Sequence, residues 1–290
     1  MKYAAGLPDV GQDALAMAKR ALAEDGSVDV TSEVVGAAGV AATGVVEYRS
    51  GGVLAGTAYA NAVANLCECG DLNWSARDGE RVNAGTAVAT LEGDLAQVLI
   101  AERTLLNFLQ RACGIATATR AFVDAVAGTG CRVLHTRKTV PGLRVFDAHA
   151  VLAGGGRLHR LSLASAVLVK DNHWHVLDKD GSSLRDACDA ARGRGVEGIY
   201  VEVENLAQVK RACDAGATRL LIDNQDPDGF RRLAAVARQS VPNIEIEATG
   251  GVTLESARGY AEAGADFLSV GALTHSVIAA DIALEITARD

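Results

Sequence analysis

Four cationic side chains stand in or beside apolar runs in the middle of the chain. Arg137 and Lys138 follow one such run, Lys170 follows another, and Arg160 ends the turn-rich segment between them. A cation withdrawn from water at the end of a strand is costly unless an anion meets it, and arginine presents a planar fork that suits carboxylate or phosphate. These residues therefore predict a site for an anionic ligand.

The charge balance indicates that this site is local. The chain has 28 Lys plus Arg against 36 Asp plus Glu, a formal net charge of -8. A protein that coats nucleic acid or an acidic membrane surface would carry the opposite excess. The cations instead have two open interpretations: ligand contacts, or structural ion pairs with Glu202, Asp223 or Glu247.

Two acidic residues end consecutive apolar runs, so we expect both to face the same mouth. Glu202 and Asp223 could hold a divalent ion together with a phosphorylated substrate, since Mg²⁺ typically takes one or two carboxylates and keeps its waters. They could also contact sugar hydroxyls. Pairing with Lys138 or Lys170 is an equally weighted alternative.

Two glycine-containing turns later in the chain predict a phosphate site. Thr249-Gly250-Gly251 and Val270-Gly271-Ala272 each lead from a strand candidate toward a helix candidate. Glycine lets the backbone approach an anion, and the amide groups at a helix start carry partial positive charge. Glycine also serves ordinary tight turns, so position in the last units of the pattern is what favours the phosphate interpretation.

The histidines differ in their placement. His159 stands beside Arg160 and is a candidate ligand or acid–base group. His173, His175 and His275 are expected to be polar turn residues without a chemical role.

The elements that position these residues are indicated from about residue 116 onward, where short apolar runs alternate with Ala-rich amphipathic stretches, typical of βα units. Polar residues follow nearly every apolar run, at the carboxyl end of each expected strand. In a barrel all of these strand ends converge on one mouth, whereas in an open sheet only the two strand ends at the switch point meet. We therefore expect an α/β barrel. The expected strands are 131–135, 166–170, 199–203, 219–223, 243–248 and 266–271, and the expected helices lie near 144–153, 182–194, 205–214, 228–239 and 253–263.

The first part of the chain has a different pattern and is expected to form a separate α+β region. Helices are expected near 11–23 and 57–66, strand-like alternation at 39–48, and a turn-rich hairpin at 78–86. A long helix is expected at 95–127, with Gly114 as a break and Gly128 as its stop. Glu102 and Arg103 on this helix are expected to form an exposed ion pair.

Composition sets the remaining bounds. No run reaches the ~18 apolar residues of a membrane span, and the start lacks the apolar core of a secretory signal, so we expect a cytoplasmic protein without membrane or nucleic-acid partners. The six cysteines are scattered, which predicts neither a disulfide framework nor a structural metal site.

An ordered set of segments runs through most of the chain. They are Ala21–Asp25, Asp29–Ser32, Gly52–Gly56, Glu102–Arg111, Gly114–Thr117, Thr136–Arg144, Gly154–Gly156 with His159 and Arg160, Lys170–His173, Glu202–Leu206, Asp223-Asn224 and Val270–Leu273. In order and spacing they resemble the quinolinate phosphoribosyltransferase family, although no single segment is decisive.

The resemblance implies a fold and an activity. The fold is an N-terminal α+β sandwich at 1–112 and an incomplete α/β barrel of six or seven strands at 113–275, with residues of about 276–290 packing back on the first domain. The activity is transfer of phosphoribosyl from phosphoribosyl pyrophosphate (PRPP) to quinolinate with loss of CO₂, which yields nicotinate mononucleotide and pyrophosphate for NAD biosynthesis.

The resemblance also assigns residues. Quinolinate would meet Arg103, Thr136, Arg137, His159, Arg160 and Lys170, with Arg103 supplied by the other subunit of a homodimer. Lys138, Glu202 and Asp223 would be catalytic and contact PRPP, with Asn224, Thr249, Gly250, Gly251, Val270, Gly271 and Ala272. Glu202 and Asp223 would also hold Mg²⁺, partly through water or substrate.

Some positions depart from the family's common residues: His135, Leu158, Ser162, Ser165, Tyr200, Gln225 and Thr249. Most flank the expected ligands rather than replace them. They leave two alternatives open: a related phosphoribosyltransferase for a different pyridine or aromatic acid, and a non-catalytic sensor of a phosphate ligand.

Overall fold

The computed structural model describes residues 7, 9–26, 28–179 and 183–289, and the described chain divides into two compact units. The antiparallel unit comprises the described residues of 7–120, 139–155 and 273–289. The parallel unit comprises those of 121–138 and 156–272. Residues 113–120, 139–155 and 273–275, which were expected in the barrel domain, therefore cluster with the antiparallel unit.

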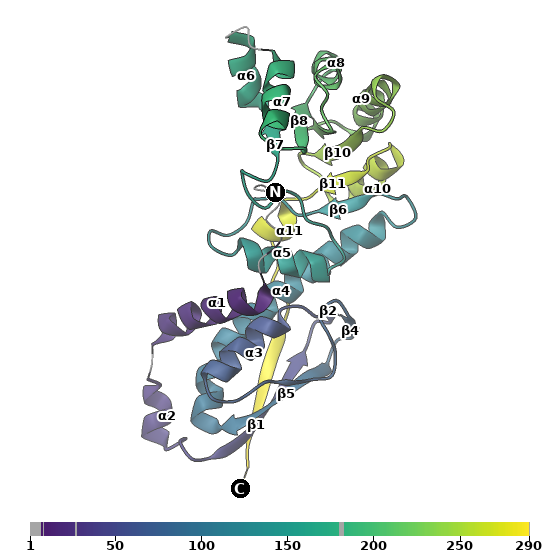
Figure 1. Cartoon of the computed structure of the whole chain (residues 1–290). Coiled ribbons are helices and arrows are strands. Elements are labelled where there is room, and N and C mark those ends of the chain that lie inside the picture. The colour runs from purple at the N-terminus through teal and green to yellow at the C-terminus, as the bar shows by residue number, and fades with distance from the viewer. Residues whose placement is uncertain (1–6, 8, 27, 180–182, 290) are drawn as a thin grey trace. The chain divides into compact units, whose positions relative to one another are not determined.

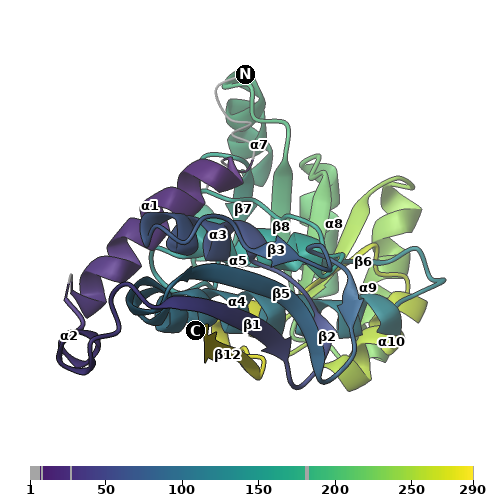
Figure 2. The same ribbon diagram turned by 90° about the horizontal axis from the view of Figure 1, so that it is seen from below.

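A four-stranded sheet in the order β12-β1-β5-β3 forms the base of the antiparallel unit (Figure 2). Its central strand β1 alternates half-buried and buried side chains, as expected for a sheet with one packed face. Strand β12 comes from the C-terminal segment and pairs with β1 in antiparallel register, Tyr48 opposite Ile282. The strands are β1 (Ala41–Tyr48), β3 (Asn73–Trp74), β5 (Thr86–Asp94) and β12 (Ile282–Ala288), and β2 (Gly52–Val53) pairs separately with β4 (Arg81–Val82).

The helices of this unit are α1 (Val10–Asp25), α2 (Val30–Val35), α3 (Thr57–Leu66), α4 (Leu95–Ala125), α5 (Arg144–Ala153) and α11 (Ala272–His275), the last beginning at the unit boundary. Helix α4 is continuous through Gly114, so the expected break there is wrong. A Cβ at this position would meet the backbone oxygen of Ile278, and the glycine therefore permits a close approach of the C-terminal segment. None of the helices in the described ranges combines the length and apolar character needed to cross a membrane.

A buried ion pair joins two helices of the antiparallel unit. Asp147 on α5 is fully buried, and Nε and Nη2 of Arg111 on α4 donate to its two carboxylate oxygens at 3.0 Å each. Arg111 also donates to the backbone oxygen of Thr274. Burial raises the pKa of Asp147 to about 6, although the charge and hydrogen bonds of Arg111 act to lower it.

We expect Arg111→Met to lower the free energy of unfolding at pH 7 by about 3–5 kcal/mol, because it leaves a buried carboxylate without its partner. The loss should shrink at pH 5, where Asp147 is protonated in the folded state. Adding Asp147→Asn should recover part of the loss. Urea unfolding at both pH values measures these differences, and equal stability of wild type and Arg111→Met would contradict the expectation.

Six parallel strands form the sheet of the other unit, in the order β6-β11-β10-β9-β8-β7 (Figure 1). Strands β6 and β7 stand at the two ends of this order, so the barrel is incomplete, as expected. A parallel bridge between Leu134 and Arg157 adds a short contact beyond β6. The strands are β6 (Arg132–Leu134), β7 (Val167–Val169), β8 (Ile199–Val203), β9 (Arg219–Asp223), β10 (Glu245–Thr249) and β11 (Phe267–Ser269).

The helices that follow β8, β9 and β10 begin at side-chain caps. Asn205, Asp226 and Thr253 each accept a hydrogen bond from a backbone N–H in the first turn, and Pro227 occupies the first position of α9. These caps fix where the turns after the strands end. The helices are α6 (Asp171–Lys179), α7 (Leu184–Gly193), α8 (Leu206–Asp214), α9 (Pro227–Ser240) and α10 (Leu254–Glu262). Helix α6 was not expected, and residue 182, the expected start of the next helix, lies outside the described residues.

Alternation along the parallel strands separates an apolar face from a polar one. In β8, Ile199, Val201 and Val203 are buried, and Tyr200 and Glu202 have the opposite orientation. The same alternation places Arg219 and Asp223 of β9 on this polar face, together with Glu245, Glu247 and Thr249 of β10. The parallel register sets Arg219 opposite Tyr200 on one side and Glu245 on the other, and Asp223 opposite Thr249. This face carries the polar residues of the candidate site.

Candidate functional site

The carboxyl ends of the six parallel strands bring most of the predicted site residues to one mouth of the parallel unit. Thr136, Arg137 and Lys138 follow β6, and Lys170 follows β7. Glu202, Asp223 and Thr249 lie at the ends of β8, β9 and β10, and Val270, Gly271 and Ala272 follow β11. Arg103 is exposed on α4 and belongs to the antiparallel unit.

Two guanidinium groups lie near each other on this side of the sheet. Both Arg137 and Arg160 are half-buried, and burial followed by the charge of Arg137 lowers the pKa of Arg160, with Tyr200 acting in the opposite direction. Nε of Arg137 is buried and makes no hydrogen bond with any described residue. Nη1 of Arg160 donates to the backbone oxygen of Ala166 at 3.3 Å. Two neighbouring cations, with a buried donor that no described residue uses, have the chemistry to bind an anion.

The acidic residues form a second cluster. Lys170 Nζ lies 2.5 Å from Oε2 of Glu202, so the ion-pair alternative holds for this lysine. Burial raises the pKa of Asp223, and the negative charge of Glu202 raises it further. The positive charges of Lys170 and Lys138 act in the opposite direction. All four predicted groups therefore interact electrostatically.

This cluster fits a magnesium ion bound jointly with a substrate. Burial and the neighbouring Glu202 carboxylate both disfavour ionised Asp223, and a divalent cation would relieve this repulsion. Within the described ranges no group of three or more metal-ligating side chains occurs. Two carboxylates completed by phosphate oxygens and water are a usual donor set for Mg²⁺.

The turn after β10 packs closely against the carboxyl end of β9. Gly250 has φ +79, and a Cβ on it would lie 2.6 Å from Oδ1 of Asp223 and also against the Asn224 side chain. Asn224 itself has φ 51, donates from its side chain to Asp223, and its backbone N–H bonds the oxygen of Thr249. The Thr249-Gly250-Gly251 turn and the Asp223-Asn224 pair thus form one continuous surface.

We expect Gly250→Ala to raise KM for the phosphorylated substrate about tenfold or more, because the added methyl displaces Asp223 and Asn224. Gly264→Ala is the matched control. Gly264 also has positive φ, +101, but no atom lies within 4 Å of the Cβ position. Steady-state kinetics of both variants separate backbone strain from crowding, and equal effects of the two changes would refute the contact argument.

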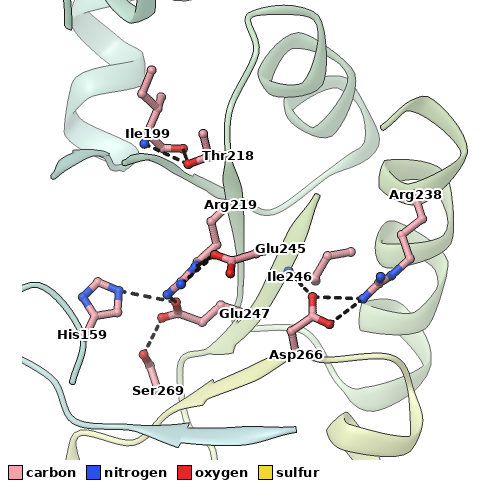
Figure 3. A network of polar contacts seen from close by, with 10 residues as sticks. All are labelled: His159, Ile199, Thr218, Arg219, Arg238, Glu245, Ile246, Glu247, Asp266 and Ser269. Carbon is pink, nitrogen blue, oxygen red and sulfur yellow. Dashed lines mark hydrogen bonds and ion pairs between the residues drawn. The ribbon is translucent and has the colours of Figure 1, made fainter. Parts of the chain in front are cut away.

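A buried polar network underlies the mouth (Figure 3). Glu247 is completely buried and contacts Arg219, whose Nη1 lies 3.0 Å from Oε2, and Ser269, whose hydroxyl donates to Oε1. Nε2 of His159 lies 3.4 Å from Oε2 of Glu247. Glu245 binds the other side of Arg219. From the sequence, Glu247 was expected only as one of three ion-pair partners, and Arg219 was missed. The available signal for Arg219 was a charged residue within an apolar strand.

The remaining predicted residues have local roles. Oγ1 of Thr136 accepts a hydrogen bond from the backbone N–H of Lys138 at 3.1 Å. Nδ1 of His173 accepts from the backbone N–H of Lys170 at 2.9 Å, but His173 lies in the first turn of helix α6, so its expected place in a turn is wrong. Val270 is buried and its N–H bonds Leu134.

Several departures from the family pattern contact the candidate site directly. His135 is buried, and its Nδ1 accepts a hydrogen bond from the backbone N–H of His159 at 2.9 Å. The ring of Tyr200 lies edge-on to His159, with 5.6 Å between ring centroids. Gln225 donates to the backbone oxygen of Asp223 at 3.3 Å. These three side chains therefore lie beside predicted site residues and do not occupy their positions.

Comparison with protein families gives two adjacent matches. Residues 29–113 match the quinolinate phosphoribosyl transferase N-terminal domain, and residues 115–285 match the C-terminal domain of the same family. Together they cover most of the chain.

Individual proteins of similar sequence and structure agree with this match. The chain is 38% identical to a nicotinate-nucleotide pyrophosphorylase [carboxylating] from Mycobacterium leprae over 92% of this chain and 95% of the relative. It is 34% identical to a probable enzyme of that name from Methanothermobacter thermautotrophicus, over 91% and 95%. The structures of NadC from Streptococcus pyogenes and of the nicotinate-nucleotide pyrophosphorylase from Francisella tularensis superpose with TM-scores of 0.89 and 0.88, each at 30% identity. Both alignments cover 98% of this chain, with 100% of the Streptococcus chain and 99% of the Francisella chain.

Proposed function

Because the chain belongs to the quinolinate phosphoribosyl transferase family, we propose that it is an enzyme that transfers phosphoribosyl from PRPP to quinolinate, with decarboxylation to nicotinate mononucleotide. The observation that carries this assignment is the Arg137–Arg160 pair, which lies at the same mouth as the Glu202–Asp223 carboxylates. A dianionic aromatic acid needs the paired guanidinium groups, and the ribose and metal of a phosphorylated sugar need the carboxylates beside them.

The arginine pair provides the acceptor site. Quinolinate carries two adjacent carboxylates, and Arg137 and Arg160 can each bind one through the guanidinium fork. His159 adds a ring nitrogen beside them, and Lys170 exchanges its Glu202 partner for a carboxylate of the acceptor. Binding the acid relieves the repulsion between the two guanidinium groups, which favours a dianion over a monoacid.

The carboxylate cluster provides the donor site. Lys138 binds the pyrophosphate of PRPP, and the Glu202 and Asp223 carboxylates orient its ribose hydroxyls. Backbone amides of the turn at Thr249–Gly251 and of Gly271-Ala272 bind the 5′-phosphate, with Val270 holding the second turn against Leu134. Negative charge beside ribose C1 stabilises the positive charge that develops there as pyrophosphate leaves. The pyridine nitrogen, held by the arginine pair, then bonds to C1.

Decarboxylation follows from the product of that step. The ring nitrogen becomes cationic and stabilises the electron pair that remains on C2 when the C2–CO₂⁻ bond breaks. The 2-carboxylate leaves as CO₂, and a proton from water then bonds to C2. Mg²⁺, bound by Glu202, Asp223 and the donor, would supply charge neutralisation of the leaving pyrophosphate.

We propose further that the enzyme acts as a homodimer in which Arg103 completes the acceptor site of the partner subunit. Arg103 is exposed on α4, two turns before the buried pair formed by Arg111. A solvated arginine on a rigid helix is available to a neighbouring molecule without rearrangement.

An acceptor panel tests the assignment. Pyrophosphate release should be measured with PRPP, Mg²⁺ and, in turn, quinolinate, nicotinate, nicotinamide and benzoate. Quinolinate should give the highest kcat/KM, since it alone in the panel has two carboxylates for the arginine pair. A monoacid as best substrate would identify a related transferase, and PRPP binding without turnover of any acceptor would identify a sensor.

A further inference from the structure

Glu247 is a buried carboxylate that contacts two basic side chains, Arg219 and His159, although one ion pair would be enough to hold it. It lies in the middle of β10 with no exposed surface, and Arg219, Ser269 and His159 surround its two oxygens (Figure 3). Desolvation acts to raise the pKa of Glu247, but the contact and charge of His159, together with Ser269 and Arg219, outweigh it and lower the pKa. The carboxylate is therefore ionised in the interior of the sheet face.

Arg219 has a full set of partners without Glu247. Its Nε and Nη2 bind Oε2 of Glu245 at 2.8 and 2.7 Å. Its guanidinium also lies over the rings of Phe267 and Tyr200, 4.0 and 4.6 Å from their centroids. A second carboxylate deeper in the interior carries a desolvation cost that this arginine does not by itself explain.

His159 is held in place from three sides. Its backbone N–H donates to His135, its ring lies against Tyr200, and its Nε2 faces Glu247. In Figure 3 the opposite ring nitrogen points away from the network. The next residue along the chain is Arg160 of the proposed acceptor site. Among the described residues, Glu247 on β10, Tyr200 on β8 and His135 contact His159, Arg160 is its chain neighbour, and Arg219 on β9 binds the same Glu247 oxygen.

The 3.4 Å approach of Nε2 to the Glu247 carboxylate links these facts to the acceptor, although the angles of this contact are not those of a hydrogen bond. A nitrogen that faces a carboxylate at this distance avoids repulsion when it carries a proton. If the imidazole were neutral, its other nitrogen would then be a bare acceptor and would repel a substrate carboxylate. Only the imidazolium offers an N–H to Glu247 and a second N–H to the ligand at once.

We propose that Glu247 is a positioning residue that holds His159 as an imidazolium, with Nε2–H on the Glu247 carboxylate and Nδ1–H directed at a carboxylate of the acceptor acid. This inference rests on the proposed function for the identity of the acceptor. Glu247 itself does not touch the substrate; it acts through His159.

Glu247→Gln tests this role, with Glu245→Gln as its matched control. The two residues lie on the same strand and face and bind the same arginine, but only Glu247 contacts His159. We expect Glu247→Gln to raise KM for quinolinate about tenfold while KM for PRPP changes little, because a charge-assisted hydrogen bond to the acceptor is lost. Glu245→Gln should leave KM for quinolinate within about twofold of wild type.

A double-mutant cycle separates this role from a structural one. In a His159→Asn background, Glu247→Gln should add no further increase in KM for quinolinate, since its effect passes through the imidazole. Additive effects, or an equal effect of Glu245→Gln, would overturn the proposal.

Nitrogen NMR of the imidazole gives a readout that does not depend on turnover. The His159 ring, assigned by its loss in His159→Asn, should show two protonated nitrogens at pH 7 in wild type and in Glu245→Gln, and a neutral tautomer in Glu247→Gln. A neutral ring in wild type would overturn the proposal whatever the acceptor is. If wild type shows the imidazolium yet forms no product from quinolinate, the proposed function fails while the Glu247–His159 pairing stands.

Discussion

Arg137→Ala is expected to lower kcat/KM for quinolinate by about 10²–10³-fold, with much less effect on KM for PRPP. The change removes one of the two guanidinium groups, together with its buried Nε, which no described residue binds. It also leaves a carboxylate of the bound acceptor without its fork partner. Initial rates with each substrate varied in turn measure the two parameters.

Arg132→Ala is the matched control for this prediction. Arg132 begins β6 at the end of the strand opposite to Arg137, and its guanidinium lies over the ring of Phe267. Its removal deletes the same charge from the other end of β6, away from the mouth, so the kinetics should stay near wild type. A comparable loss in both variants would mean that net charge or folding, and not the acceptor contact, explains the effect of Arg137→Ala.

Mixing two inactive variants should restore activity if Arg103 serves the partner subunit. The Arg103→Ala subunit keeps an intact barrel but cannot contribute Arg103 to its partner's site. The Lys138→Ala subunit contributes Arg103 to its partner but has an inactive barrel of its own. Co-expressed in equal amounts, half of the dimers are hybrids with one complete site, so roughly one quarter of wild-type activity is expected. Each variant alone should be nearly inactive.

The control for this experiment combines Arg103→Ala with a chain that carries both Arg103→Ala and Lys138→Ala. Those hybrids contain no complete site, and their activity should stay at the background of the single variant. Restoration in this control, or none in the test mixture despite verified hybrid dimers, would show that Arg103 does not act across the interface.

The barrel strands were largely predictable because their signal is local. Strands β8 and β9 have the bounds expected, since each is a short apolar run closed by a polar residue at the mouth. Other elements depend on distant partners. Strand β12 was missed because its pairing partner β1 lies near the other end of the chain, and helix α6 was missed because its polar residues 171–173 resemble a turn.

The candidate site, like the fold, was predictable from the sequence where the signal is local. Residues at strand ends could be found because topology alone brings the carboxyl ends together. The Glu247 network could not, because it depends on the register that sets Arg219 opposite Tyr200 and Glu245, and on the loop that carries His159 to β10. Charged residues are expected at the surface, so sequence patterns give little sign of such interior pairing.

Product identity with quinolinate labelled with ¹³C in its 2-carboxylate tests the central claim most directly. With PRPP and Mg²⁺, each nicotinate mononucleotide formed should be matched by one pyrophosphate and one ¹³CO₂, and the product should be unlabelled. Lys138→Ala, assayed in parallel, should form none of the three. A labelled product, pyrophosphate release without CO₂, or no product at all would contradict the assignment.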